Sequence, residues 1–200
     1  NITLKYPKNG EYRSAYVIAN IDDEPTDEAM VFYEYTSNGS EEDGLRVNIL
    51  DKDEDGKWYS VKELAGAGTD IDQVIISPMG SNNQTDVFVG YQNLTNDEKT
   101  MEIYSYTDGD FKRVALDTYS VLEPLDINND GYIELITIQR STNNDTGAVT
   151  AKASMLNMKN NEITRGENVD MCDNVTSYVS SKTGMLDLSL IHISEPTRPR

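Results

Sequence analysis

The segment Asp126–Glu134 carries the clearest pattern of possible metal ligands. It reads D-x-N-x-D-G-x-x-E, which places oxygen-bearing side chains at alternating positions before a glycine. Calcium takes roughly six to eight hard oxygen ligands at about 2.3–2.6 Å, and such an alternation lets one short loop direct several oxygens at one ion. Gly131 permits the sharp turn that this requires. The predicted calcium ligands are the side chains of Asp126, Asn128, Asp130 and Glu134 and the backbone carbonyl of Tyr132.

The residues that follow this loop favour a strand over a helix. An EF-hand loop needs an acidic ligand at its twelfth place, which here is Thr137, inside the β-branched run Leu135–Ile138. The loop is therefore expected to join two strands, with its last ligand at the ninth place. The alternative is a solvated polar turn without metal.

Strands must position this loop, because alternating apolar and polar residues dominate the chain and helical periodicity is weak. We predict an all-β protein in which four strands and their turns recur. The expected strands are Ser14–Ala19, Ala29–Tyr35, Leu45–Leu50 and Lys57–Val61; Gln73–Ile76, Asp86–Tyr91, Met101–Tyr106 and Phe111–Val114; and Ser120–Leu122, Glu134–Ile138, Val149–Leu156 and Glu162–Thr164.

The spacing of equivalent residues supports a repeat. Trp58, Phe111 and Ile163 each follow the third turn of a unit, so the unit recurs about every 50 residues, as in the blades of β-propellers. We predict a propeller fragment of about three four-stranded antiparallel blades at 12–66, 70–117 and 119–171, with the start of another at 173–187. A β-sandwich with evenly spaced hairpins is the alternative.

Two other acidic segments are weaker candidates. Asn20–Glu28 occupies the equivalent place in the first unit, but Pro25 replaces the glycine. We treat it as a degenerate site whose possible ligands are Asn20, Asp22, Glu24 and Glu28. Asp51–Gly56 also reads D-x-D-x-D-G, yet the repeat register predicts a tight hairpin there.

The loop Asp126–Glu134 resembles the calcium loops of the FG-GAP/VCBS family of β-propellers, which occur in integrin α-subunits and many bacterial surface proteins. In that family the loop links the first and second strands of a blade, which is its place here. The resemblance implies a structural calcium ion within a propeller. Ser120–Leu122 and Val61–Asp70 are also similar to lipoproteins of gut clostridia, which implies an extracellular, lipid-anchored location on a Gram-positive bacterium.

The charge of the chain restricts its partners. Its net charge of −18 repels phosphate backbones and anionic membrane surfaces. We therefore expect no nucleic-acid partner, and membrane attachment only through an anchor outside this sequence. The acidity suits cations, and it also maintains solubility.

No catalytic residues are predicted. The single histidine, His192, lies in the C-terminal tail, so a Ser-His-Asp triad has no base in the remainder. Cys172 is the single cysteine, which leaves no internal disulfide and no histidine to activate it. Calcium is the one expected cofactor.

We therefore expect a monomeric, non-catalytic, extracytoplasmic module that binds or presents a protein or carbohydrate ligand. The first alternative is part of a propeller-fold carbohydrate-active enzyme, since two suitably separated carboxylates can support sugar hydrolysis. The second is the sensory ectodomain of a membrane receptor. A carboxylate pair that converges at the propeller axis would favour the enzyme.

Residues 188–200 are expected to be a non-native tail, because Leu188–Arg198 resembles the translation of a transposon end and adaptor used to prepare sequencing libraries. Deleting 188–200 should leave the melting temperature unchanged, since such a tail packs against nothing. Thermal melting of the full and shortened chains tests this expectation, and a marked loss of stability would contradict it.

Overall fold

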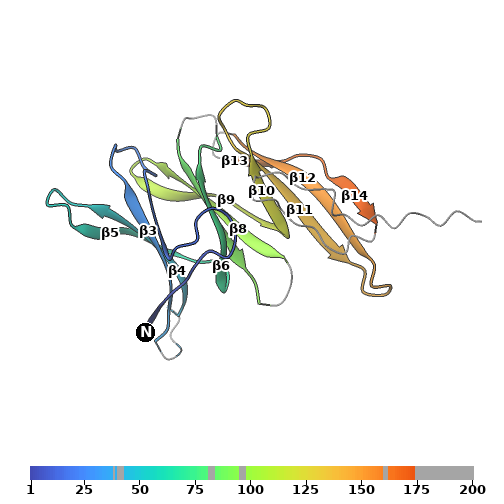
Figure 1. The fold of residues 1–200 in the computed structure, drawn as a ribbon, viewed down its shortest axis with the longest axis horizontal. Coiled ribbons are helices and arrows are strands. Elements are labelled where there is room, and N and C mark those ends of the chain that lie inside the picture. Colours follow the sequence, from blue (N-terminus) through green and yellow to red (C-terminus); the bar gives the residue numbers. More distant parts are fainter. Residues whose placement is uncertain (38, 40–42, 81–83, 95–97, 160–161, 174–200) are drawn as a thin grey trace, which may run out of the picture.

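The computed structural model describes residues 1–37, 39, 43–80, 84–94, 98–159 and 162–173, and within these ranges the chain is all-β with no helix (Figure 1). It follows that none of these residues forms a helix long and apolar enough to cross a membrane. Residues 174–187 of the predicted start of a fourth unit, and the tail at 188–200, lie outside the described residues, the last of which is Asp173.

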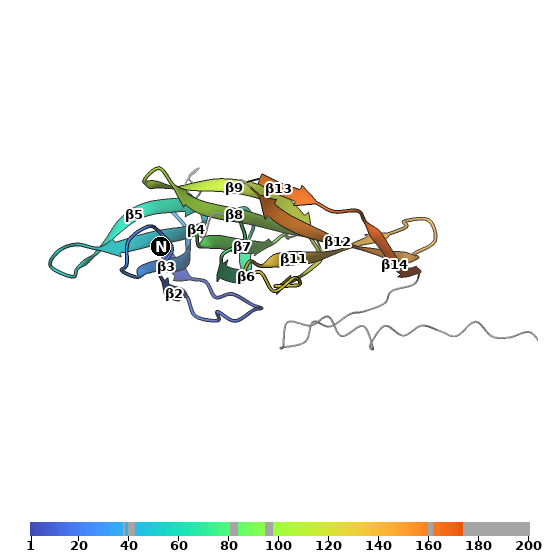
Figure 2. The ribbon, with the colours of Figure 1, turned by 90° about the horizontal axis from the view of Figure 1, so that it is seen from above.

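Three antiparallel sheets follow one another along the chain, and none is closed. Sheet 1 contains β2 (Tyr16–Ala19), β3 (Glu28–Tyr35), β4 (Gly44–Lys52) and β5 (Trp58–Ala65). Sheet 2 contains β6 (Asp70–Ser77), β7 (Asp86–Gln92), β8 (Lys99–Thr107) and β9 (Asp110–Tyr119). Sheet 3 contains β10 (Val121–Leu125), β11 (Glu134–Thr142), β12 (Val149–Lys159) and β13 (Glu162–Arg165). Every predicted strand overlaps one of these, and the sheets lie side by side (Figure 2).

Sheets 1 and 3 each have five strands, which corrects the prediction of four strands in every unit. In sheet 1, β2 has 4 residues and β3 has 8, and β1 (Ile2–Leu4) pairs with the part of β3 that β2 leaves open. In sheet 3, β13 has 4 residues against 11 in β12, and β14 (Val169–Asp173) takes the remaining edge. Both additions pair otherwise open backbone groups.

The repeat register predicted from the turns is confirmed. Trp58, Phe111 and Ile163 each lie within the first two residues of a strand, namely β5, β9 and β13, which are the fourth strands of the predicted units. Their partners on the preceding strands β4, β8 and β12 are Lys52, Tyr106 and Met158, respectively. The three units therefore share the order of four consecutive antiparallel strands and the position of the third turn.

Sheet 2 is covered on both faces. Val87, Val89 and Tyr91 of β7 belong to a core shared with sheet 1, whereas Phe88 of the same strand belongs to a second core shared with sheet 3. This division follows from the alternation of side chains along a strand. Burial of an apolar side chain of this size contributes about 1.5–3 kcal/mol, so the two cores hold the three sheets together.

A buried polar cluster connects the N-terminal segment to sheet 2. Asp72 lies at a β-bulge in β6 and is 1% exposed. Its carboxylate accepts hydrogen bonds from Asn9 Nδ2 at 2.8 Å and from the Tyr119 hydroxyl at 2.6 Å, and it lies 2.8 Å from Lys99 Nζ. Three donors therefore compensate the burial of this charge.

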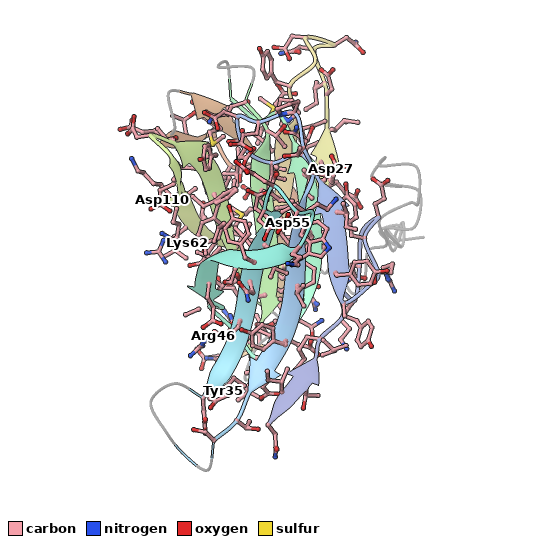
Figure 3. The ribbon with its side chains drawn as sticks, turned by 90° about the vertical axis from the view of Figure 1, so that its left-hand side faces the viewer. Asp27, Tyr35, Arg46, Asp55, Lys62 and Asp110 are labelled. Carbon is pink, nitrogen blue, oxygen red and sulfur yellow. The ribbon has the colours of Figure 1, made fainter. Side chains whose placement is uncertain are left out.

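An ion pair joins sheets 1 and 2 near their fourth strands. Lys62 of β5 and Asp110 of β9 lie next to each other (Figure 3), with 2.8 Å between Nζ and Oδ1. Both side chains are partly exposed, so this pair contributes less than the buried cores.

Tyr119→Phe should lower the free energy of unfolding by about 1–2 kcal/mol, because it removes a donor from the buried Asp72 carboxylate. Urea unfolding measures the loss. Tyr106→Phe, at a half-buried ring that packs on Phe111, is the matched control and should cost less. Equal losses in the two variants would contradict a structural role for the Tyr119 hydroxyl.

Candidate metal site

The strands β3, β7 and β11, one in each sheet, each begin with an acidic residue. The carboxylate of that residue closes the loop that precedes the strand. In each case it accepts a hydrogen bond from the backbone N–H seven residues earlier. The pairs are Ile21 N to Glu28 Oε2 at 2.8 Å, Met79 N to Asp86 Oδ2 at 3.0 Å, and Ile127 N to Glu134 Oε2 at 2.9 Å. The ninth-place acid therefore has a structural role in each loop, with or without a metal.

The loop between β10 and β11 turns as its sequence predicts. Asn129 has φ 59° and Gly131 has φ 89°, so both occupy the left-handed region, which glycine and asparagine tolerate best. The two carboxylate oxygens of Asp126 accept the N–H groups of Asp130 at 3.1 Å and of Gly131 at 3.0 Å. Asp126 thereby holds the loop in its curved form.

Three of the predicted ligands of this loop converge. Asn128 Nδ2 donates to Asp130 Oδ2 at 3.0 Å and to Glu134 Oε1 at 3.3 Å. The amide nitrogen thus stands between two carboxylates, where positive charge is favoured, and rotation of the amide would present its oxygen instead. Tyr132, the predicted carbonyl ligand, donates its N–H to Asp130 Oδ1 at 2.9 Å.

The loop Asp126–Glu134 has the oxygen-bearing side chains that a cation site needs, but these side chains are not yet close enough together to surround an ion. Among the described residues, no three acidic or cysteine side chains lie close enough together to hold a metal ion as they stand. In the loop Asp126–Glu134, Asp126 is directed at backbone N–H groups, and Asn128 separates the other two acids. A bound ion would require the Asn128 amide to turn.

The weaker loop in sheet 1 follows a different path. No residue from Asn20 to Glu28, all of which are described, has a positive φ, which agrees with Pro25 at the place of the glycine. Asn20 Nδ2 donates to the backbone carbonyl of Glu24, and Asp22 Oδ1 accepts the Glu24 N–H at 2.8 Å. Asn20 and Asp22 therefore serve the turn itself.

The acids of sheet 1 interact electrostatically. Burial raises the pKa of the Glu28 carboxyl, the N–H of Ile21 opposes that rise, and the negative charges of Asp22 and Asp51 add to it. Burial likewise raises the pKa of Asp22, with further contributions from Asp51 and Asp23. Asp51 therefore belongs to this group, although the sequence pattern assigned it to the hairpin Asp51–Gly56 and not to the loop Asn20–Glu28.

Asp51–Gly56 forms the predicted hairpin. Asp53 accepts the N–H groups of Asp55 and Lys57 through one carboxylate oxygen, at 3.0 and 2.8 Å. Gly56 has φ 76° and donates to the Asp53 carbonyl. These acids close a β-turn between β4 and β5, as Asx residues commonly do.

In sheet 2, the carboxylate of Asp86 is saturated by protein donors. One oxygen accepts the N–H groups of Met79 at 3.0 Å and Gly80 at 3.3 Å, and the other accepts the hydroxyl of Ser105. Burial raises the pKa of Asp86, and these three donors oppose the rise. Ser105, on the neighbouring strand, is a partner that no local sequence signal indicates.

A scan against models of known protein families finds no match to this chain, and a search of curated proteins finds no relative. The functional argument therefore rests on the loops and on the repetition of the sheets. Of these, the loop Asp126–Glu134 has the most specific chemistry.

Asp86→Ala should lower the free energy of unfolding by about 3 kcal/mol, because it leaves three buried donors without an acceptor. Asp86→Asn is the matched control and should cost about 1 kcal/mol, since an amide can accept from the backbone and donate to Ser105. Urea unfolding with and without calcium tests both variants, and we expect no calcium dependence of either loss. Equal losses for Ala and Asn would contradict this assignment.

Proposed function

We propose that this chain is a non-catalytic binding or scaffolding module, part of an FG-GAP/VCBS-type β-propeller, that carries a structural calcium ion at Asp126–Glu134. The observation that carries the proposal is the convergence of Asn128, Asp130 and Glu134 in a loop that joins the first two strands of a sheet. A calcium ion there would replace the bridging amide nitrogen and tie β10 to β11. The ion would stiffen the sheet without contacting a ligand.

The propeller is supported by the way that the sheets repeat and cover one another. Val89 and Tyr91 of sheet 2 are fully buried against sheet 1. Their equivalents in sheet 1, Val31 and Tyr33, are only partly buried. The same outer face exposes four further apolar side chains, those of Ile2, Leu4, Tyr16 and Ile18. Another sheet of the same kind would cover this face, as neighbouring blades do in a propeller.

The buried acids of sheet 2 support a structural rather than a catalytic role. Asp72 lies against Lys99 and the Tyr119 hydroxyl. Glu102 Oε1 lies 2.6 Å from Arg113 Nη1, and Glu102 Oε2 accepts a hydrogen bond from the Tyr104 hydroxyl at 2.7 Å. Each charge has its own counter-charge and donor, an arrangement that stabilises ionised acids in a core.

We place the ligand, a protein or carbohydrate, on the loops at the sheet edges, because loops on a rigid β scaffold commonly carry recognition. The net charge of −18 suits an extracellular, calcium-containing medium and opposes nucleic-acid binding. An extracellular location, a lipid anchor on a Gram-positive cell surface and a monomeric state complete the proposal.

Saturating calcium should raise the melting temperature of the wild type by several degrees, because an ion that binds only the folded loop stabilises it by mass action. Asp130→Ala should lose the larger part of this rise, since it removes a central ligand and leaves Gly131 in place. Magnesium should substitute poorly, because it requires tighter octahedral geometry.

The matched control is Asp145→Ala, which removes an equal charge from the exposed turn between β11 and β12. It should keep the full response to calcium. If Asp130→Ala responds as the wild type does, the segment Asp126–Glu134 is only a polar turn.

A further inference from the structure

One oxygen of Glu28 is buried and lacks a partner. Glu28 is 1% exposed, and its Oε2 accepts the N–H of Ile21 at 2.8 Å. Its Oε1 is one of the few buried side-chain atoms, among the residues that the structure describes, with no hydrogen-bond partner. A buried carboxylate oxygen in this state costs free energy that a donor or a cation would offset.

The strand register brings a second carboxylate beside Glu28. Ala29 pairs with Leu50, so the next residues outward, Glu28 and Asp51, are cross-strand neighbours on one face of the sheet. Like charges in such positions destabilise a sheet. Asp51 also accepts the Tyr59 hydroxyl at 3.2 Å, and its charge acts on both Glu28 and Asp22.

Lys52, the residue after Asp51, is directed elsewhere. Lys52 Nζ lies over the ring of Trp58, 4.5 Å from its centroid. Asp22, by contrast, is held by its contact with the Glu24 N–H, and its charge raises the pKa of Glu28. Negative charge from the loop and from two strands is therefore concentrated at the buried oxygen.

The other sheets satisfy the corresponding oxygen with a protein donor. In sheet 2, Ser105 pairs with Asp86 and donates its hydroxyl to Oδ1. In sheet 3, the amide of Asn128 donates to Glu134 Oε1. At the Ser105 position sheet 1 has Asp51, which has no proton to donate when it is ionised.

We propose that sheet 1 holds a second cation site, in which Glu28, Asp51 and Asp22 draw together around one calcium ion. As they stand, these three carboxylates are not close enough together to hold a metal, so binding requires their side chains to move. It differs from the loop site because one ligand comes from the neighbouring strand β4, and because the loop lacks the glycine turn. Carboxylate oxygens are the ligands that calcium prefers, and its variable coordination suits groups from a loop and two strands. The proposal does not depend on the site at Asp126–Glu134.

Calcium chloride titrated into Asp130→Ala by calorimetry tests this site with the loop site removed. We expect one calcium ion per chain in Asp130→Ala and none in Asp130→Ala/Asp51→Ser. The matched control, Asp130→Ala/Glu54→Gln, removes one negative charge at an exposed turn residue and should still bind one ion. Absence of binding to Asp130→Ala, or unchanged binding after Asp51→Ser, would overturn the proposal.

Asp51→Ser alone provides a second readout that does not require calcium. It copies the Ser105 arrangement of sheet 2, so it should raise the melting temperature in chelator and remove part of the response to calcium. Glu28→Gln should act in the same direction, because its amide can accept from Ile21 and donate to Asp51. If both variants melt lower than the wild type in chelator, Glu28 does not lack a donor and the proposal is wrong.

Discussion

Mutual covering of the three sheets is the constraint on which the rest of the structure depends. Each sheet is a single layer built on a four-stranded meander, and a single layer cannot bury the apolar residues on its faces by itself. Sheet 2 is stabilised because sheets 1 and 3 cover its two faces. Polar groups that enter these cores must bring partners with them. Asp72 is matched by Lys99 and Glu102 by Arg113, all within sheet 2. Asp72 also accepts a hydrogen bond from Asn9, which joins the N-terminal segment to this central sheet.

The acidic residues that begin β3, β7 and β11 each use their two carboxylate oxygens differently. The first oxygen has one task throughout, which is to accept the backbone N–H at the start of the loop. The second oxygen differs in each sheet: it meets a serine hydroxyl, an asparagine amide, or no donor. Under the proposed function, a repeat that retains the structural bond would gain or lose a cation site through a single neighbour, Ser105, Asn128 or Asp51.

Local patterns predicted the strands, the hairpin at Asp51–Gly56 and the turn at Gly131, because alternation and turn chemistry depend on adjacent residues. The edge strands β1 and β14 were not predicted, since they fill space left by short neighbours rather than follow a strong pattern of their own. The pairing of Glu28 with Asp51 was also missed. It follows from the register between β3 and β4, which no short stretch of sequence encodes.

A crystal structure of the wild-type chain grown with terbium in place of calcium tests the central claim most directly, because the anomalous signal locates the ion. The account predicts a peak bounded by Asp126, Asn128, Asp130 and Glu134, with the Asn128 amide turned so that its oxygen faces the ion and with metal–oxygen distances of about 2.3–2.6 Å. A loop without a peak, with the Asn128 nitrogen still between the Asp130 and Glu134 carboxylates, would contradict it.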